Sequence, residues 1–218
     1  FGAIVDKGQI FQLINAIRQG DRIIAIVAPA FLGQFGPEAT PERLTAAMKR
    51  LGFAGVVEVA VGADLCTIEE AKDFMEKVPA QQPFMATSCC PAWSVMAKKL
   101  FPQFKDYISM ALTPMVLTAR LQKQKDPGCR IAFIGPCAAK KLEASRRTIR
   151  SDVDFVLTFE ELQGMFEAKG VDFAAIPPEE EVPLNEGTGA GRGFAVTGGV
   201  AGAVVEAIGR LEPGREVK

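Results

Sequence analysis

The sequence contains no histidine, and this absence excludes more chemistry than any other property of its 218 residues. Histidine is the usual general acid or base near neutral pH and a common metal ligand. Catalysis by histidine, His–Cys dyads and histidine-ligated metal sites are therefore all excluded. A metal site in this chain must use cysteine thiolates or carboxylates.

Several other features are scarce. No apolar run reaches the roughly 18 residues that a membrane-spanning helix needs. The 25 basic and 26 acidic residues nearly cancel, so the charge favours neither a nucleic-acid partner nor an acidic membrane. Five cysteines, two of them adjacent, do not suit a secreted disulfide framework, and we expect a cytoplasmic protein. The sequence starts without methionine or a signal peptide, as a piece of a longer protein would.

Short apolar runs alternate with amphipathic segments along the chain, which predicts an α/β fold with mostly parallel strands. The length allows one large domain or two small lobes. Residues 176–192 are rich in Pro, Gly and Glu and are predicted to form a surface loop. We predict strands at 23–27, 55–59, 84–87, 130–134 and 155–158, and helices at 41–50, 67–77, 94–100, 114–126, 159–168 and 200–210, with another helix starting at 138.

The adjacent Cys89 and Cys90 lie in the stretch 87–93, TSCCPAW, between a predicted strand and a predicted helix. Neighbouring residues on an extended segment point in opposite directions, so we expect the two thiols to have different roles. Pro91 suits the first turn of a helix. A thiolate at that turn faces the positive end of the helix dipole, which lowers its pKa and favours metal binding or proton transfer.

A second cysteine, Cys137, follows the predicted strand at 130–134. Ligands of open parallel sheets bind at the carboxyl ends of the strands, so Cys90 and Cys137 could face one site. The alternative is that both are small residues packed in tight turns. Cys129 begins the strand that Cys137 ends, roughly 25 Å away at ~3.3 Å per residue, and Cys66 is typical of a packing residue. The chain thus offers two good thiolate ligands, whereas a cubane cluster needs four.

Three charged residues are further candidates. Lys140 follows Cys137 by about one helical turn, so its ammonium could reach back over the same cavity, or it could be an ordinary solvated lysine. Glu70 and Asp73 share a helix face and could relay protons, or they could form a solvated acidic surface.

These motifs resemble the catalytic domain of iron-only, or [FeFe], hydrogenases. The resemblance implies an α/β fold with two lobes of mostly parallel β-sheet flanked by helices, about 20–128 and 129–218, the second incomplete at its C-terminal end. The active site would lie in the cleft between the lobes. The stretches that are similar to the family, in order, are 27–30 (VAPA), 62–65 (GADL), 87–93, 136–144 (PCAAKKLEA), 152–158 (DVDFVLT) and 197–200 (TGGV).

The resemblance also implies roles for the cavity residues. Cys90 and Cys137 match two of the four thiolates that hold the [4Fe–4S] subcluster of the H-cluster. Cys89 matches the thiol that passes protons to the diiron subcluster. Lys140 matches the lysine that hydrogen-bonds a cyanide on the distal iron, and Pro29 matches a residue that lines the diiron pocket.

Glu70, Ser109 and Asp73 match positions of the family's proton path. Four residues depart from the family's usual pattern. Gly135 replaces the usual methionine, Asp73 the usual glutamate and Lys77 the usual arginine, and Ala30 is a fourth departure. These departures suggest a divergent, sensory branch.

The two ends of the sequence also matter. The family's third signature, which supplies the other two cluster thiolates, should follow the region of residues 198–199 but does not occur before Lys218. Residues 1–4 look like the tail of the last cysteine motif of an upstream ferredoxin-like module. We therefore expect a fragment with no cluster or an incomplete one, inactive by itself.

Three functions follow as expectations. In the first, the intact protein of an anaerobe reversibly reduces protons to H₂, with electrons from a ferredoxin-like domain and a cluster delivered by maturation proteins. In the second, a sensory domain reports H₂ or redox state. In the third, the protein is a non-catalytic iron–sulfur assembly protein related to hydrogenases.

Overall fold

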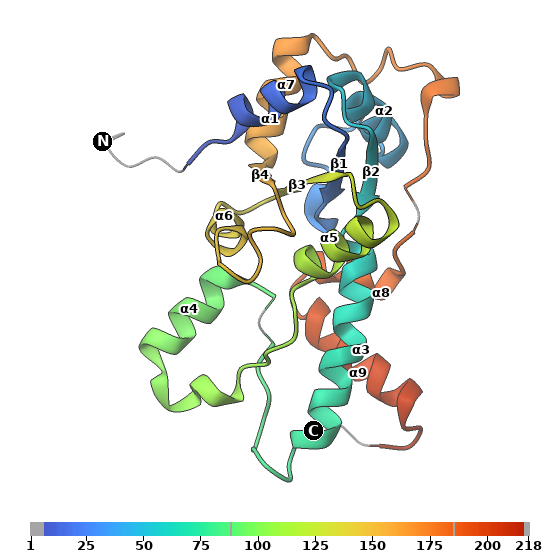
Figure 1. Ribbon diagram of the computed structural model, residues 1–218. Helices are drawn as coiled ribbons and strands as arrows, with labels where there is room; N and C mark the ends of the chain where they lie inside the picture. Colours follow the sequence, from blue (N-terminus) through green and yellow to red (C-terminus); the bar gives the residue numbers. More distant parts are fainter. Residues whose placement is uncertain (1–6, 88, 185, 216–218) are drawn as a thin grey trace.

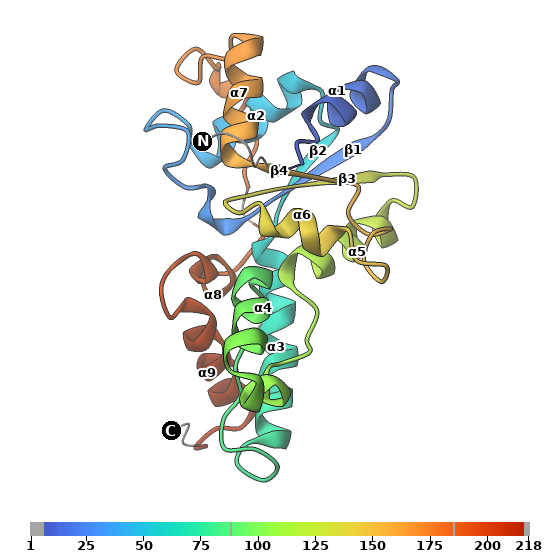
Figure 2. The same ribbon diagram turned by 90° about the vertical axis from the view of Figure 1, so that its left-hand side faces the viewer.

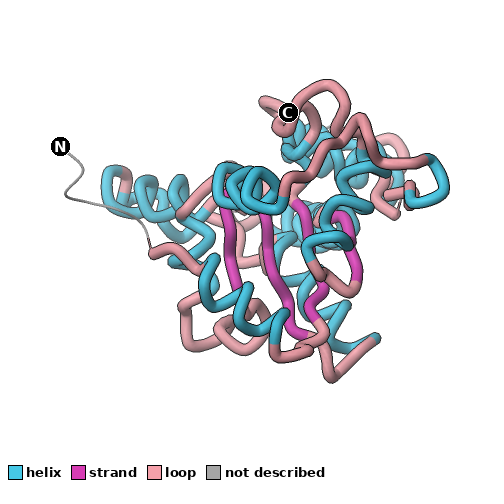
Figure 3. The backbone as a smooth tube through the Cα atoms, turned by 90° about the horizontal axis from the view of Figure 1, so that it is seen from above, coloured by secondary structure: helices cyan, strands magenta, loops and turns pink. Residues whose placement is uncertain are grey.

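The computed structural model describes residues 7–87, 89–184 and 186–215, and its strands form one parallel sheet. Seen from above, the strands lie side by side with helices around them (Figure 3). Both central strands are almost wholly buried, as expected of a parallel sheet covered on both faces. In sheet order, the strands are β2 (Gly55–Glu58), β1 (Ile23–Val27), β3 (Arg130–Gly135) and β4 (Phe155–Thr158).

Helices cover both faces of this sheet (Figure 2). Helices α1 (Ile10–Arg18), α2 (Pro41–Leu51) and α7 (Phe159–Lys169) lie on one face. Helices α5 (Pro114–Lys125) and α6 (Ala139–Ala144) lie on the other. The main hydrophobic core joins the sheet to both layers.

The remaining helices extend away from the sheet (Figure 1). The long helix α3 (Ala60–Lys77) packs against α5 and against α9 (Gly199–Leu211). Helix α4 (Pro91–Leu100) and the 3₁₀ segment η2 (Pro102–Tyr107) contact each other and form a separate arm (Figure 1). The short elements η1 (Pro29–Phe31), η3 (Pro178–Glu180), α8 (Gly189–Arg192) and η4 (Gly193–Ala195) complete the described elements.

Local capping explains why several predicted boundaries are confirmed. At the start of α2, the side chain of Thr40 accepts a hydrogen bond from the backbone N–H of Arg43, and Gly52 ends the helix with a φ of 107°. At the start of α7, Thr158 and Glu161 form a reciprocal capping box. Such caps are visible in sequence because the residues that form them are only three positions apart.

The prediction of a strand at 84–87 is wrong. Only Ala86 forms a bridge, an isolated parallel one with Ile108. The ring of Phe84 packs against Phe104 and Tyr107, with centroid distances of 5.5 and 5.1 Å. The apolar side chain thus finds its partners in η2 rather than in the sheet.

The α/β fold with parallel strands is confirmed, but a second lobe is not shown. Strand β3 follows residue 128 and β1 precedes it, yet they pair along their whole length, from Ile23 with Arg130 to Val27 with Ile134. Strands from both halves of the chain therefore share one sheet. In the part of the chain that the structure describes, no helix is long and apolar enough to cross a membrane.

Residues 176–184 and 186–192 contain more regular structure than the predicted surface loop. They contain η3 and α8, and Ile176 and Leu184 are buried in the main core. Helix α1 was not predicted, and α3 begins seven residues before its predicted start at Thr67.

Candidate functional site

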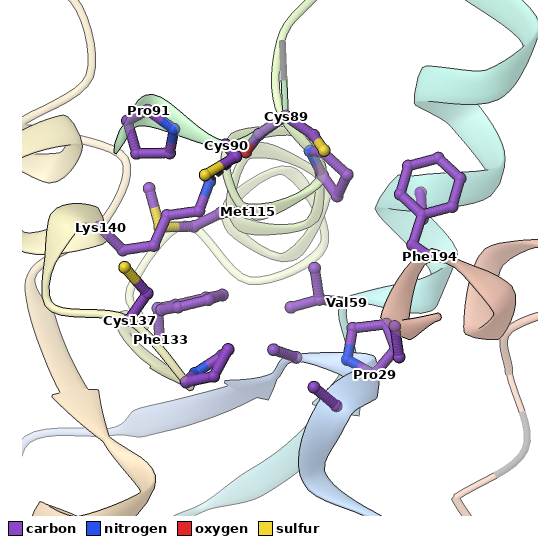
Figure 4. A pocket seen from close by; sticks show the side chains of 16 residues that line it. Pro29, Val59, Cys89, Cys90, Pro91, Met115, Phe133, Cys137, Lys140 and Phe194 are labelled. Carbon is purple, nitrogen blue, oxygen red and sulfur yellow. Dashed lines mark hydrogen bonds between the residues drawn. The ribbon is translucent and has the colours of Figure 1, made fainter. Parts of the chain in front are cut away.

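A cavity of about 200 Å³ lies at the carboxyl ends of β1, β2 and β3. This is where ligands of open parallel sheets bind. Each strand leads directly into a lining residue. The lining side chains converge on the cavity from six separate segments of the chain, and Figure 4 shows those of the labelled residues. The lining residues are Ala28, Pro29, Ala30, Val59, Ala63, Cys89, Cys90, Pro91, Pro114, Met115, Phe133, Pro136, Cys137, Lys140, Phe194 and Ala195.

Two exposed thiols face this cavity from different elements. Cys137 follows the end of β3, and its Sγ accepts a hydrogen bond from the backbone N–H of Ala139 at 3.4 Å. Cys90 is the N-cap of α4, and its Sγ accepts from the backbone N–H of Trp93 at 3.5 Å. Each sulfur is thus oriented at the cavity by a backbone hydrogen bond, and cysteine sulfurs are the ligands that hold iron–sulfur clusters.

Lys140 is held inside the site rather than solvated. Its Nζ donates to the backbone carbonyl of Cys89 at 2.9 Å and to Oε2 of Glu143 at 2.6 Å. Only 14% of the lysine side chain is exposed. The sequence-based alternative of an ordinary surface lysine is therefore wrong.

Glu143 is a site residue that the sequence reasoning missed. It is 1% exposed, and its second oxygen, Oε1, accepts from the hydroxyl of Thr113 at 2.7 Å. The available signal was its position three residues after Lys140, where a helix brings two side chains together.

Cys89 lies half-buried at the cavity wall. Burial raises the pKa of its thiol, nearby Lys140 lowers it in part, and Glu70 raises it further. The expectation that the helix turn lowers the pKa is therefore wrong for Cys89, because the N-cap position belongs to Cys90. At neutral pH the Cys89 sulfur keeps its proton.

The predicted proton-path carboxylates do not line the cavity. Glu70 is 1% exposed within α3, so it does not belong to a solvated acidic surface. It lies close enough to raise the pKa of the Cys89 thiol. Asp73, one turn further on, is partly exposed and pairs with Lys77 at 3.0 Å. Of the two carboxylates on α3, Glu70 is therefore buried and Asp73 is accessible to solvent.

Ser109 lies beside the segment that carries the adjacent cysteines. It is buried, and its backbone N–H donates to the carbonyl of Ala86 at 2.8 Å. Ser88, part of the predicted cysteine motif, lies outside the described residues, as do residues 1–4. The roles of Ser109, Glu70 and Asp73 as proton carriers stay predictions.

The other two cysteines lie away from the cavity. Cys66 is buried in α3, where burial raises the pKa of its thiol, and Cys129 is buried at the opposite end of β3 from Cys137. The described residues form no group of three or more His, Cys, Asp or Glu side chains suited to a metal ion. The donor set that faces the cavity therefore fits two of the four thiolates of a cubane cluster.

The segment before α9 closes another side of the cavity through Phe194 and Ala195. Arg192 holds this segment in place, because Nε and Nη2 bind the two carboxylate oxygens of Glu58 at 2.9 Å each. Glu58 ends β2 and is buried, and it also accepts from the backbone N–H of Gly187. No local sequence pattern predicts this pairing, since its partners are 134 positions apart.

Comparison with known proteins places the cavity in context. Residues 21–217 match the family described as "Iron only hydrogenase large subunit, C-terminal domain". The chain is 29% identical, over 246 aligned positions, to the NADP-reducing hydrogenase subunit HndD of Solidesulfovibrio fructosivorans. That alignment covers 100% of this chain and 42% of the relative.

The chain superposes on a solved structure of the [FeFe]-hydrogenase HydA(deltaEFG), which was reported for stepwise H-cluster assembly, with a TM-score of 0.78 at 28% sequence identity. The superposition covers 97% of this chain and 60% of that one. The chain is also 35% identical, over 156 residues, to a probable cytosolic Fe–S cluster assembly factor of Aedes aegypti, covering 63% of this chain and 32% of the relative. The chain thus spans less than two thirds of the length of each of these proteins.

Proposed function

Because the chain belongs to the family of the iron-only hydrogenase large subunit, C-terminal domain, we propose that the intact protein is an [FeFe]-hydrogenase that interconverts H₂ with protons and electrons. One observation carries the proposal. Lys140 is fixed between the Cys89 carbonyl and Glu143, at a cavity that the thiols of Cys90 and Cys137 also face. An assembly that combines ligand thiols, a proton-bearing thiol and a fixed cation suits an anionic metal cofactor.

Cys90 and Cys137 would hold the [4Fe–4S] part of the H-cluster, and none of the described residues supplies the two further thiolates. When bound, the cofactor supplies the redox chemistry. The protein keeps water away from it with an apolar lining that includes Pro29, Phe133 and Phe194.

The chain's own residues would move and hold protons. Burial raises the pKa of the Cys89 thiol, so its Sγ keeps a proton at neutral pH and would form the inner end of the proton path. Glu70, with Asp73 and Ser109, would resupply that proton from the surface. Lys140, which Glu143 and the Cys89 carbonyl hold at the cavity, would donate a further hydrogen bond to an anionic ligand of the cofactor.

Electrons would come from a ferredoxin-like donor, and maturation proteins would deliver the cofactor. The test is anaerobic maturation of the full-length protein, followed by infrared spectroscopy and an H₂ assay. Carbonyl and cyanide bands with H₂ evolution are expected. A protein that carries its [4Fe–4S] cluster but shows neither the bands nor turnover would contradict the proposal.

A second function is iron–sulfur assembly without a diiron unit, which the similarity to an assembly factor favours. The placement of Cys89 and Lys140 at the cavity supports the hydrogenase instead, because neither residue is needed to hold a cubane. The same spectra separate the two functions, since an assembly protein would show iron–sulfur absorption alone.

A third function is a sensory hydrogenase-like domain, which the departures at Gly135 and Asp73 favour. It predicts slow turnover in the mature protein. Replacing Gly135 by methionine, together with Phe133→Leu to make space for the new side chain, would then raise H₂ turnover relative to Phe133→Leu alone. Unchanged turnover would count against a sensory role.

A further inference from the structure

The ring of Phe133 covers Gly135 at the carboxyl end of β3. The two residues are two positions apart on one strand, so their side-chain directions share a face of the sheet. A Cβ added to Gly135 would lie 2.5 Å from Cε1 and 2.6 Å from Cζ of Phe133. These distances are far shorter than real carbon contacts, so the ring occupies the space of a side chain at position 135.

The backbone gives no other reason for a glycine here. Gly135 is not among the described glycines with positive φ, and it pairs with Thr158 in the regular parallel ladder between β3 and β4. A glycine in a strand interior often marks a close approach by another group. At Gly135 the approaching group is the aromatic ring of Phe133.

The same ring forms part of the cavity. Phe133 lines it together with Cys137, Met115 and Lys140, and its side chain projects into the space below them (Figure 4). The ring therefore lies against both the position of the added Cβ at 135 and the cavity. Ala28 also limits the space, because its Cβ is 3.4 Å from the position of the added Cβ. A side chain at 135 would therefore push the ring into the cavity.

We infer that Phe133 takes the place of a side chain at position 135 as the wall of the cavity beside Cys137, and that it sets the shape of the cavity there. Under the hydrogenase function proposed above, on which this part rests, the bound cofactor meets an aromatic face rather than a side chain at 135. Phe133 is then a positioning residue of the site. A methionine at 135 would need Phe133 to become smaller at the same time.

The test is a double-mutant cycle in the cluster-free chain, with Gly135→Ala, Phe133→Leu and the double variant. Xenon is the probe, because apolar cavities of this size bind it. Its binding is followed through the methyl NMR signals of Met115 and Ala28. Alone, Gly135→Ala should weaken xenon binding about threefold or more and lower the unfolding temperature by about 2–10 °C, since overpacking strains the site. When Phe133 is already leucine, Gly135→Ala should neither weaken xenon binding nor lower the unfolding temperature.

Gly209→Ala is the matched control, because an added Cβ there meets no atom within 4 Å. It should leave xenon binding unchanged. Equal effects of Gly135→Ala in both backgrounds, or no effect in either, would overturn the inference. If xenon does not bind the wild-type chain, the unfolding temperatures decide.

Folding itself is a further readout. Failure of Gly135→Ala to fold, with rescue by Phe133→Leu, would support the inference, whereas failure in both backgrounds would show that the backbone is the obstacle. The chain carries no cofactor in this experiment, so a negative result would leave the hydrogenase proposal standing.

Discussion

The ammonium of Lys140 lies 2.6 Å from a carboxylate oxygen of Glu143, one helical turn away along the same short helix. The carboxylate is almost completely buried, and its other oxygen is fixed by the hydroxyl of Thr113 at the start of α5. The position of the lysine therefore depends on the hydrogen bond that joins Glu143 of α6 to Thr113, the N-cap of α5. Glu143 acts on the site through Lys140 and is a positioning residue.

Removing this carboxylate should free the lysine and destabilise the fold. Glu143→Ala leaves a mostly buried cation with one carbonyl partner, so we expect a loss of about 3 kcal/mol in the free energy of unfolding. Glu143→Gln keeps hydrogen-bonding capacity and should cost less. In both variants Lys140 should react faster with acetic anhydride, as measured by peptide mass spectrometry.

Glu161→Gln is the control for this experiment. Lys141 binds Glu161 at 2.9 Å in a similarly shielded pair, next to Lys140 in sequence but directed at α7. The control should leave the reactivity of Lys140 unchanged. If Glu161→Gln and Glu143→Gln increase that reactivity equally, Glu143 does not position the lysine.

Iron binding should depend on the two exposed thiols alone. Anaerobic reconstitution of the 218-residue chain is expected to give less than one [4Fe–4S] cluster per chain, because the cavity supplies two thiolates. Cys90→Ala or Cys137→Ala should remove the bound iron, measured by absorption and iron analysis. Stoichiometric binding that is lost in Cys66→Ala or Cys129→Ala would contradict this assignment of ligands.

The sequence predicts those parts of the fold that depend on neighbours along the chain. Strand β4 and the start of α2 are confirmed because a continuous apolar run and a Thr-Pro cap are local signals. The start of α3 was missed because the helix follows β2 directly, and its N-cap, Val59, makes no side-chain capping bond. The prediction of a strand at 84–87 is wrong because the apolar side chain of Phe84 is packed against aromatic rings of η2 instead of in the sheet.

The candidate site divides in the same way. The placement of Cys90 and Cys137 at one cavity was predictable, since both follow from helix starts and from the geometry of parallel sheets. The burial of Glu143 inside a lysine-rich stretch was not, because it needs Thr113 from another helix. The position of the Phe133 ring over Gly135 was not predictable either, because the alternation of residues along a strand does not determine the rotamer of a side chain.

Proton supply should depend more on Glu70 than on Asp73. In the matured full-length protein, Glu70→Gln should lower H₂ turnover about a hundredfold or more, because a buried acid in a relay has no substitute. Asp73→Asn should have a smaller effect, because water can reach its position. Unchanged carbonyl and cyanide bands would show that both variants keep the cofactor. Equal losses of turnover would contradict the proposed direction of the path.

Stability should fall at alkaline pH through Cys66. Burial raises the pKa of this thiol in the folded state, so above pH ~9 only the unfolded state loses the proton. The free energy of unfolding then falls by up to about 1.4 kcal/mol per pH unit for this one group. Urea titrations between pH 8 and 10 should show a shallower decline for Cys66→Ala than for the wild type. Parallel curves would indicate that the thiolate is tolerated inside the protein.

Two arginine–carboxylate pairs of the same geometry should differ strongly in their contribution to the free energy of unfolding. Arg192 binds Glu58, and Arg50 binds Glu180, each through Nε and Nη2 at 2.8–2.9 Å. The side chain of Glu58 is 3% exposed, whereas that of Glu180 is 43% exposed. Water can therefore replace the arginine at Glu180 but not at Glu58.

Arg192→Met should consequently lower the free energy of unfolding by about 3–5 kcal/mol, because it leaves a buried carboxylate without its cation. Arg50→Met should have a much smaller effect on the free energy of unfolding, because that pair is exposed to water. Urea unfolding of the two variants measures both values. Arg192→Met should also change the NMR signals of Phe194 and Ala195, since Arg192 holds their segment against the cavity. Similar stability losses in the two variants would mean that exposure of the carboxylate does not determine the strength of these pairs.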